Sequence, residues 1–401
     1  MVQWRRTLYV SWVTQFFAVM GFSFVMPFIP YYIQELGITD LKQVGWWAGL
    51  VTSAQALSMA LMAPMWGALS DRYGRKLMVQ RAMFSGAVVL SLMALVTSVQ
   101  QLLVLRFVQG MLTGTVSAST ALVASITPKE HAGKTLGSLQ TASFLGVSFG
   151  PLLGGILGDS LGYRPSFLVT GGLLLLSGIL VTFLIHEDFH PSEDVLRGSA
   201  RGYGATARVL AAGGLLAIFA VRIVMRIGSR VLGPVLPLFV QTIVPVGAPV
   251  ASATGLIAAG SALGSAVGSP LIGRWGDRYG HRRMLVLSAI AAGICFIPQA
   301  AVNSPWTLVF WQILSGFAVG GTISTITALL AASAPEGHHG AVFGADASVV
   351  AAANAVGPLA GAAIAAGFGL RTPFLLAAGL LLLGAFMASL WVRGGRGVGM
   401  G

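Results

Sequence analysis

The sequence predicts an all-α membrane protein whose twelve spanning helices form two six-helix bundles of the same orientation. Three observations support this prediction: the chain is strongly apolar, its apolar runs are long enough to cross a bilayer, and its second half repeats its first. Of the 401 residues, 55% are hydrophobic and 9% are charged, whereas a soluble domain carries about 25% charged residues. The chain therefore has too little polar surface to cover a soluble globule.

Twelve apolar runs can each cross a membrane, because a spanning helix needs about 20 apolar residues. A linker at 186–207, expected on the cytoplasmic side, separates an N-terminal bundle at 1–185 from a C-terminal bundle at 208–401. We expect the spans near 8–34, 45–69, 77–98, 101–126, 135–160, 165–185, 208–240, 250–273, 284–301, 306–332, 340–368 and 371–392.

The basic residues predict the orientation. With both termini in the cytoplasm, 17 of the 24 Lys and Arg residues fall in inner segments, as the positive-inside rule requires. The net charge of +12 is therefore explained by topology, and no nucleic-acid partner is expected.

The two halves are copies of one six-helix unit. A shift of 207 residues aligns Met26–Pro30 with Gly233–Pro237, and it also pairs Gly150 and Pro151 with Gly357 and Pro358. An even number of spans per copy gives a parallel repeat about the membrane normal, which is a geometry of alternating-access transporters. Breaks at proline in spans 1, 5, 7 and 11 are predicted to turn these helices toward a central cavity, or else to serve helix curvature.

Three segments resemble motifs of one family. Gly67–Lys76 is similar to the signature loop of the major facilitator superfamily, Leu102–Gly110 to the arginine motif of proton-coupled drug exporters, and Gly146–Gly155 to their antiporter motif. Together they resemble the 12-span drug:proton antiporters, and the whole chain is most similar to bacterial multidrug efflux proteins. The resemblance implies the major facilitator fold and export coupled to protons.

The first motif predicts a conformational latch at the inner mouth. Asp71 is flanked by basic residues and is expected to cap a helix start of the other bundle through the positive end of that helix; a merely positive-inside loop is the alternative. The latch residues are Gly67, Asp71, Arg72, Gly74 and Arg75, with a second-half copy at Asp277 and Arg278.

Proton coupling is assigned to Arg106, Gln109 and Asp346. A mid-membrane arginine costs about 2.5–3.5 kcal/mol on insertion scales, which favours a functional role over simple packing against carbonyl groups. By resemblance, Arg106 senses proton movement or holds a protonatable partner, and Gln109 shares its helix face. Asp346 is interpreted either as a proton carrier or as a partner between the bundles for Arg75 or a neighbouring arginine.

Glycine recurs every four residues in span 5, which predicts close helix approach. By resemblance the same strip forms a seal and hinge between the halves. The residues assigned to it are Gly146, Gly150, Pro151, Gly154, Gly357 and Pro358.

Three arginines in span 7 share one helix face at i, i+4 and i+8 spacing, and lipid is an expensive environment for them. We therefore expect a wet cavity and a cargo that is neutral or carries an anionic group. The cavity residues are predicted to be Phe24, Pro27, Arg222, Arg226, Arg230 and Pro234.

These observations predict a secondary active transporter, not an enzyme, that exports amphipathic drugs or related small molecules with protons. It is expected as a monomer in the bilayer of the bacterial inner membrane. No cofactor or metal is expected: no nucleotide-binding motif occurs, and the histidines lack ligand spacing. The alternatives are an importer or a lipid or lysolipid flippase on the same fold, and a non-transporting membrane sensor.

Overall fold

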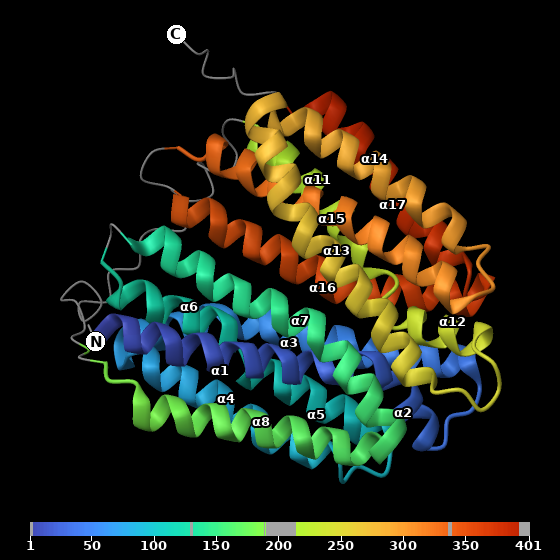
Figure 1. The fold of residues 1–401 in the computed structure, drawn as a ribbon, viewed down its shortest axis with the longest axis horizontal. Helices are drawn as coiled ribbons and strands as arrows, with labels where there is room; N and C mark the ends of the chain where they lie inside the picture. The colour runs from blue at the N-terminus through green and yellow to red at the C-terminus, as the bar shows by residue number, and fades with distance from the viewer. Residues whose placement is uncertain (1–2, 129–130, 188, 190–213, 336–338, 393–401) are drawn as a thin grey trace. The chain divides into compact units, whose positions relative to one another are not determined.

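Figure 1 shows a computed structural model, which describes residues 3–128, 131–187, 189, 214–335 and 339–392. Every element among these residues is a helix, so the predicted all-α class is confirmed. Helix is the expected result for continuous apolar runs, because a spanning segment must satisfy its backbone hydrogen bonds within itself.

The helices group into two compact units. The first comprises residues 1–39, 50–199 and 247–259, and the second comprises 40–49, 200–246 and 260–401. The predicted linker at 186–207 lies mostly outside the described residues, and the predicted domain bounds at 1–185 and 208–401 stay a prediction.

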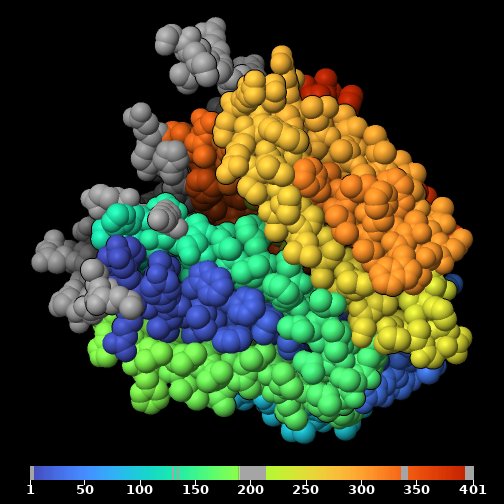
Figure 2. Space-filling view, viewed as in Figure 1, coloured from blue at the N-terminus to red at the C-terminus, as the bar shows by residue number. Residues whose placement is uncertain are grey.

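Unit 1 contains the helices of the first half of the chain. They are α1 (Gln3–Val25), the 3₁₀ turn η1 (Met26–Phe28), α2 (Ile29–Glu35), most of α3 (Leu41–Tyr73), α4 (Arg75–Met93), α5 (Val99–Leu112), α6 (Thr115–Ile126), α7 (Ala132–Leu161), α8 (Tyr163–Leu184) and the first turns of α13 (Val250–Tyr279). Figure 2 shows α1 in blue, α7 in blue-green and α8 in green as adjoining bands on one face of this unit.

Unit 2 contains the helices of the second half. They are α11 (Leu215–Arg230), α12 (Val235–Ile243), the rest of α13, α14 (His281–Gln299), α15 (Pro305–Ser333), α16 (His339–Phe368) and α17 (Thr372–Trp391), together with the first turns of α3. Within this unit α11 packs against α15, α16 and α17.

Eleven helices of the described residues are long and apolar enough to cross a membrane, one fewer than the twelve predicted spans. The difference is span 7. Its helix is divided into α11, of 16 residues, and α12, of 9 residues, because Gly233 and Pro234 break it. Its expected start at 208–213 lies outside the described residues.

The predicted proline breaks are present in spans 1 and 7 but not in spans 5 and 11. The predicted breaks at Pro27 and Pro234 are confirmed, since α1 passes into a 3₁₀ turn and α11 ends before a turn. The predicted breaks in spans 5 and 11 are wrong: α7 continues through Pro151 and α16 through Pro358. A single proline removes one N–H donor, and neighbouring helices can hold such a helix together.

Span 4 is not the single run expected at 101–126. It divides into α5 and α6 at Thr113 and Gly114, where Gly114 takes a φ of +133° that favours glycine. Thr113 Oγ1 donates to the carbonyl of Gln109 at 2.7 Å and so closes the end of α5. The break lies inside an apolar run, so hydropathy gives no sign of it.

The glycine strip of α7 lies against α1. A Cβ added at Gly150 would lie 2.5 Å from the Cβ of Ser23, and one at Gly154 would overlap the backbone of Phe24. Gly146 approaches the same helix at Met20. The expected close approach is confirmed, and its partner is a helix of the same unit; the hinge role stays a prediction.

Unit 2 repeats this contact between α16 and α11. A Cβ at Gly357 would lie 2.6 Å from the Cβ of Arg230, and one at Gly361 would overlap the backbone of Val231. These positions follow Gly150, Ser23, Gly154 and Phe24 by 207 residues, so the register of the sequence repeat is also the register of packing.

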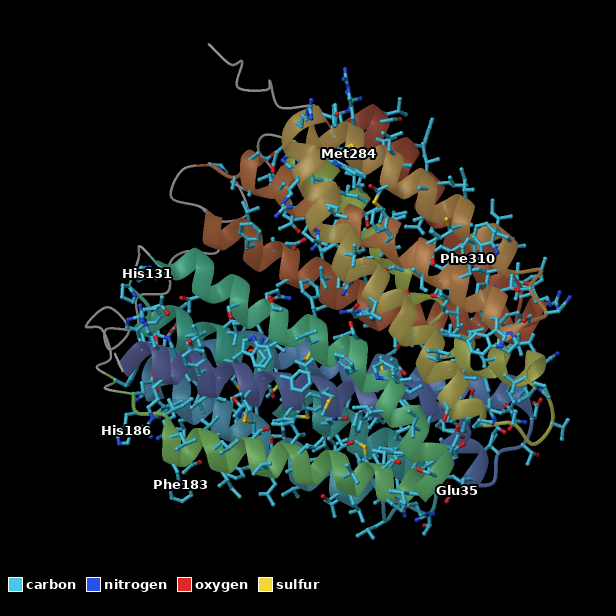
Figure 3. The ribbon with its side chains drawn as sticks, in the orientation of Figure 1. Glu35, His131, Phe183, His186, Met284 and Phe310 are labelled. Carbon is cyan, nitrogen blue, oxygen red and sulfur yellow. The ribbon has the colours of Figure 1, made fainter. Side chains whose placement is uncertain are left out.

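The ends of unit 1 are distinguishable in Figure 3, where Glu35 lies at one end and His131 and His186 lie at the other. Phe183 points outward from α8 and is 72% exposed. Exposed apolar side chains on a helix that is apolar all round are typical of a lipid-facing surface.

Candidate substrate and coupling site

The arginine ladder of α11 consists of Arg222, Arg226 and Arg230, and α16 supplies its partners in unit 2. Arg222 forms an ion pair with Asp346: Nη2 donates to Oδ2 at 2.9 Å, and Nε lies 2.9 Å from Oδ1. Arg230 Nε donates to Oδ1 of Asn354 at 3.0 Å. The structure gives Arg226 no side-chain hydrogen bond or ion pair within the described residues, and its Nε is fully buried.

The same contact in unit 1 is neutral. Gln15, the repeat equivalent of Arg222, donates from Nε2 to the carbonyl of Leu139 at 3.2 Å and to Ser143 Oγ at 2.7 Å. Leu139 is the equivalent of Asp346. Each unit therefore has an equivalent helix pair, α1 with α7 in unit 1 and α11 with α16 in unit 2. Only the pair of unit 2 carries charged side chains at this contact.

Asp346 is 8% exposed, and its partner lies in its own unit. The arginine that Asp346 contacts is Arg222, while Arg75 lies 3.8 Å from Asp71 in unit 1; the role of Asp346 as a partner between the bundles for Arg75 or a neighbouring arginine stays a prediction. Since α16 runs beside α11, the Asp346 carboxylate compensates the charge of an arginine on a neighbouring helix of the same unit. The role as a proton carrier stays a prediction.

A cavity of about 20 Å³ lies beside the ladder. It is lined from α11 by Arg222, Arg226 and Ser229 and from α15 by residues that include Val319, Thr322 and Ile326. A cavity needs about 10–15 Å³ to hold one water molecule. This one therefore admits one small occupant and, in this conformation, no drug-sized molecule.

The other predicted cavity residues lie elsewhere. Phe24 is 2% exposed and contacts Gly154 through its backbone, while Pro27 and Pro234 are buried at the ends of helix segments. None of the three lines the cavity beside the ladder.

Arg106 and Gln109 are buried together in α5, at 2% and 1% exposure. Arg106 Nη1 donates to Oε1 of Gln55 at 2.9 Å. Its Nε and Nη2, and both side-chain polar atoms of Gln109, have no partner among the described residues. Buried polar groups are normally hydrogen-bonded, so this pair is a candidate functional site of unit 1.

The latch motif is helical rather than a loop. Gly67, Asp71 and Arg72 lie in the last turns of α3, which extends to Tyr73, and Gly74 makes the turn into α4 with a φ of +99°. The predicted boundary at residue 69 was short because Asp71 and Arg72 are polar, although a helix end at the membrane surface tolerates them.

The second-half copy has the same form. Gly280, with a φ of +95°, joins α13 to α14. The Arg278 guanidinium lies 5.4 Å from the Tyr279 ring centre, as Arg72 lies 5.5 Å from Tyr73. Asp277 contacts His281 at 3.2 Å. The latch role of both copies stays a prediction.

Sequence reasoning missed Glu187, which caps α4. Its Oε1 accepts from the backbone N–H of Arg75 at 3.1 Å, and its Oε2 accepts from that of Lys76 at 2.7 Å. A carboxylate at a helix N-terminus is favoured by the helix dipole. The only sequence signal was an acid placed just after the sixth span.

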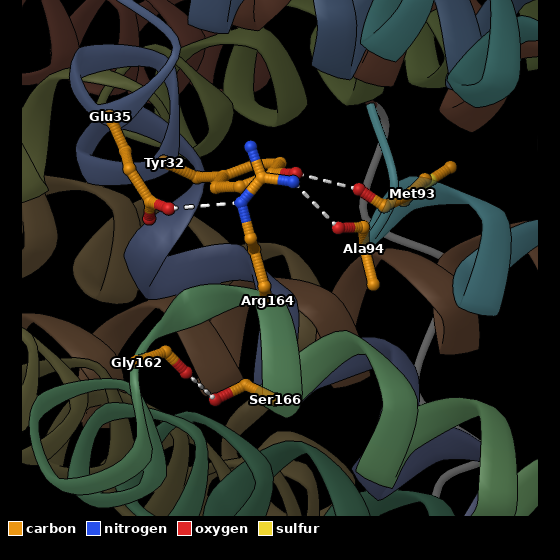
Figure 4. A network of polar contacts seen from close by, with 7 residues as sticks. All are labelled: Tyr32, Glu35, Met93, Ala94, Gly162, Arg164 and Ser166. Atoms are coloured by element: carbon orange, nitrogen blue, oxygen red, sulfur yellow. Dashed lines mark hydrogen bonds and ion pairs between the residues drawn. The ribbon is translucent and has the colours of Figure 1, made fainter. Parts of the chain in front are cut away.

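A second missed group is the network at the opposite end of unit 1 (Figure 4). Arg164 donates from Nε to Oε1 of Glu35 at 3.1 Å and from Nη1 to the carbonyl of Ala94 at 3.0 Å. Tyr32 donates to the carbonyl of Met93 at 2.7 Å. These hydrogen bonds join α2 to the start of α8 and to the end of α4.

Asp159 forms a third missed contact in unit 1. Its Oδ1 accepts from the backbone N–H of Ala251 at 3.2 Å and its Oδ2 accepts from that of Ser252 at 2.7 Å, so it caps the first turn of α13. In the same first turns of α13, the Thr254 hydroxyl lies 2.7 Å from the hydroxyl of Tyr31.

Asp159→Ala is expected to lower the free energy of unfolding by about 1–2 kcal/mol, because two N–H groups lose a charged cap. Thermal unfolding of the purified protein measures this loss. Ser160→Ala is the matched control, since the Ser160 hydroxyl bonds only within its own helix. Equal unfolding temperatures for the two variants would contradict the capping role.

The fold and these groups define a class: a multi-pass helical membrane protein with two repeated units and charged side chains buried inside its spans. The Major Facilitator Superfamily model matches residues 11–242 and 218–397, and the chain belongs to that superfamily. Membership indicates a membrane transporter.

Curated relatives match along the whole chain. The chain is 33% identical to multidrug resistance protein MdtG of Salmonella dublin over 384 residues, which cover 96% of this chain and 95% of the relative. It is 34% identical to the protein of that name from Dickeya zeae over 392 residues, covering 98% and 96%.

Solved structures share the fold. The crystal structure of the nucleoside transporter NupG aligns with a TM-score of 0.77 over 98% of this chain and 100% of that one, at 14% identity. This likeness shows the fold alone.

Proposed function

We propose that the chain exports amphipathic small molecules across the bacterial inner membrane by proton-coupled alternating access. The observation that carries the proposal is the whole-length identity of 33–34% to bacterial proteins named multidrug resistance protein MdtG. Because the similarity covers 96–98% of this chain, it includes both units and every motif described above.

Two features of the units support alternating access. Each unit contains a helix broken at equivalent prolines, Pro27 and Pro234. In each unit this helix packs against a glycine-lined helix in the same register. Units of this kind can move as bodies, since close packing makes each of them stiff. The cargo would be exposed to each side in turn.

A proton gradient is the proposed energy source. One charge moving through 100 mV supplies about 2.3 kcal/mol, whereas a tenfold solute gradient costs about 1.4 kcal/mol. Asp346 is the candidate proton acceptor, because its protonation would remove the charge that holds Arg222. Arg106 and Gln109 are the candidate coupling residues of unit 1.

The protein is proposed to act as a monomer in the lipid bilayer, with protons and the small-molecule cargo as its partners. No resident cofactor or nucleic acid takes part in the proposed cycle.

Transport in proteoliposomes tests the proposal. Purified protein is reconstituted with an acidic lumen, and cationic, neutral and anionic dyes are added outside in separate runs. We expect at least one dye to accumulate at least tenfold more than in protein-free vesicles, and a protonophore to abolish the accumulation, because protons leave as the dye enters.

Other outcomes identify the alternatives. If dye loaded into the acidic lumen left together with the protons, this would indicate an importer, and movement of a fluorescent lysolipid alone would indicate a flippase. No movement of any solute, by protein that remains monodisperse, would contradict transport and favour a sensor.

A further inference from the structure

The partners of the arginine ladder follow one register. Arg222 and Asp346 are 124 residues apart, and so are Arg230 and Asn354, so α11 and α16 run parallel along this contact. By the same register the residue opposite Arg226 is Val350, an apolar side chain. The middle arginine therefore has no polar partner on α16.

The neighbouring helices do not supply one either. Within unit 2, α11 packs against α15, α16 and α17. The sequences of α15 and α17 contain no charged residue, and the only carboxylate of α16 is Asp346. Three guanidinium groups thus face one carboxylate, which leaves two positive charges uncompensated among the described residues of this unit.

The cavity beside Arg226 fits a single small occupant. Its volume is about 20 Å³, and Arg222 and Arg226 supply its charged lining. The hydroxyls of Ser229 and Thr322 already donate to the carbonyls of Arg226 and Val319, at 2.9 and 2.7 Å. The N–H donors available to an occupant are therefore those of guanidinium groups, which favour an anion.

We propose that unit 2 binds one small inorganic anion, of the size and charge of chloride, against Arg226 between α11 and α15. The anion compensates one of the two excess charges and lets the ladder remain among apolar helices. Unit 1 has no such site, because Gln15, Val19 and Ser23 occupy the equivalent positions. The site serves the folded unit itself and does not depend on which solute is exported.

The test uses the purified full-length chain in lipid nanodiscs. Radioactive chloride binding is measured while sodium gluconate replaces sodium chloride at constant ionic strength. We expect saturable binding of one chloride per chain, together with a rise in unfolding temperature that follows the same saturation curve.

Two variants are expected to act in opposite directions. Arg226→Gln removes the guanidinium and should weaken chloride binding at least about tenfold, whereas Asp346→Asn removes the competing negative charge and should strengthen it about tenfold. Arg226→Lys keeps the positive charge but loses the forked geometry of the guanidinium group. Its chloride affinity should lie between those of the wild type and Arg226→Gln. Arg283→Gln, at an exposed position of the same unit, should bind as wild type does.

Several outcomes would overturn the proposal. They are the absence of saturable chloride binding to the wild-type protein, equal stabilisation by gluconate, and unchanged binding in Arg226→Gln. Saturable binding of phenylphosphonate without binding of chloride would also overturn it, and would assign the ladder to an anionic group of the cargo. Weaker chloride binding in Asp346→Asn would contradict the charge argument.

Discussion

Asp346→Asn is expected to lower solute accumulation driven by an imposed pH gradient at least about tenfold, because one proton at 100 mV supplies about 2.3 kcal/mol. Asparagine keeps the shape of the side chain and an oxygen that can accept from Arg222, but it cannot take up or release a proton. The carboxylate that it replaces is 8% exposed and pairs with Arg222 at 2.9 Å. Proteoliposomes with an acidic lumen measure the effect.

The control is Asp40→Asn, which removes an exposed carboxylate at the start of α3 in the same unit. It should retain the accumulation of the wild type. If Asp346→Asn also retained its full response to the pH gradient, Asp346 would not be the proton carrier, and its role would be to balance the charge of the ladder.

Hydropathy and the repeat predicted most of the fold because both are properties of the sequence alone. Each apolar run is helical within the described residues, as one helix or as two, since hydrocarbon leaves the backbone no other partner. The failures are local. Gly114 interrupts an apolar run without changing its hydropathy, and Asp71 and Arg72 extend a helix beyond the point where its apolar residues end.

The candidate site was predicted in part. Spacing alone placed Arg222, Arg226 and Arg230 on one face, and composition alone required partners for them. The pairing of Arg222 with Asp346 could not be predicted, because it depends on which helix lies beside α11 and in what register. The equivalent contact between Gln15 and Leu139 gives that register, but only after the two units are compared in space.

The caps were missed for a related reason. Glu187 and Asp159 lie in segments between spans, where an acid is usually solvated, and nothing in the local sequence distinguishes a capping acid from an exposed one. Their partners are the N–H groups of helix starts more than 90 residues away in sequence.

Gly154→Val is expected to destabilise the protein by about 3 kcal/mol, at the upper end of the usual cost of overpacking. A side chain at this position overlaps the carbonyl and Cα of Phe24, which are backbone atoms that cannot rotate away. The helices α7 and α1 would have to separate along their closest contact. Thermal unfolding of the detergent-solubilised protein should fall by about 5 °C or more.

Gly137→Val is the matched control, because Gly137 lies on the same helix and has nothing within 4 Å of an added Cβ. The two variants make the same change to helix propensity, so their difference isolates the contact with α1. We expect only Gly154→Val to lower the unfolding temperature and the monodisperse fraction. If both variants unfolded at the same temperature, α1 and α7 would have room to separate at this glycine, and the stiffness attributed to unit 1 would lack its main structural support.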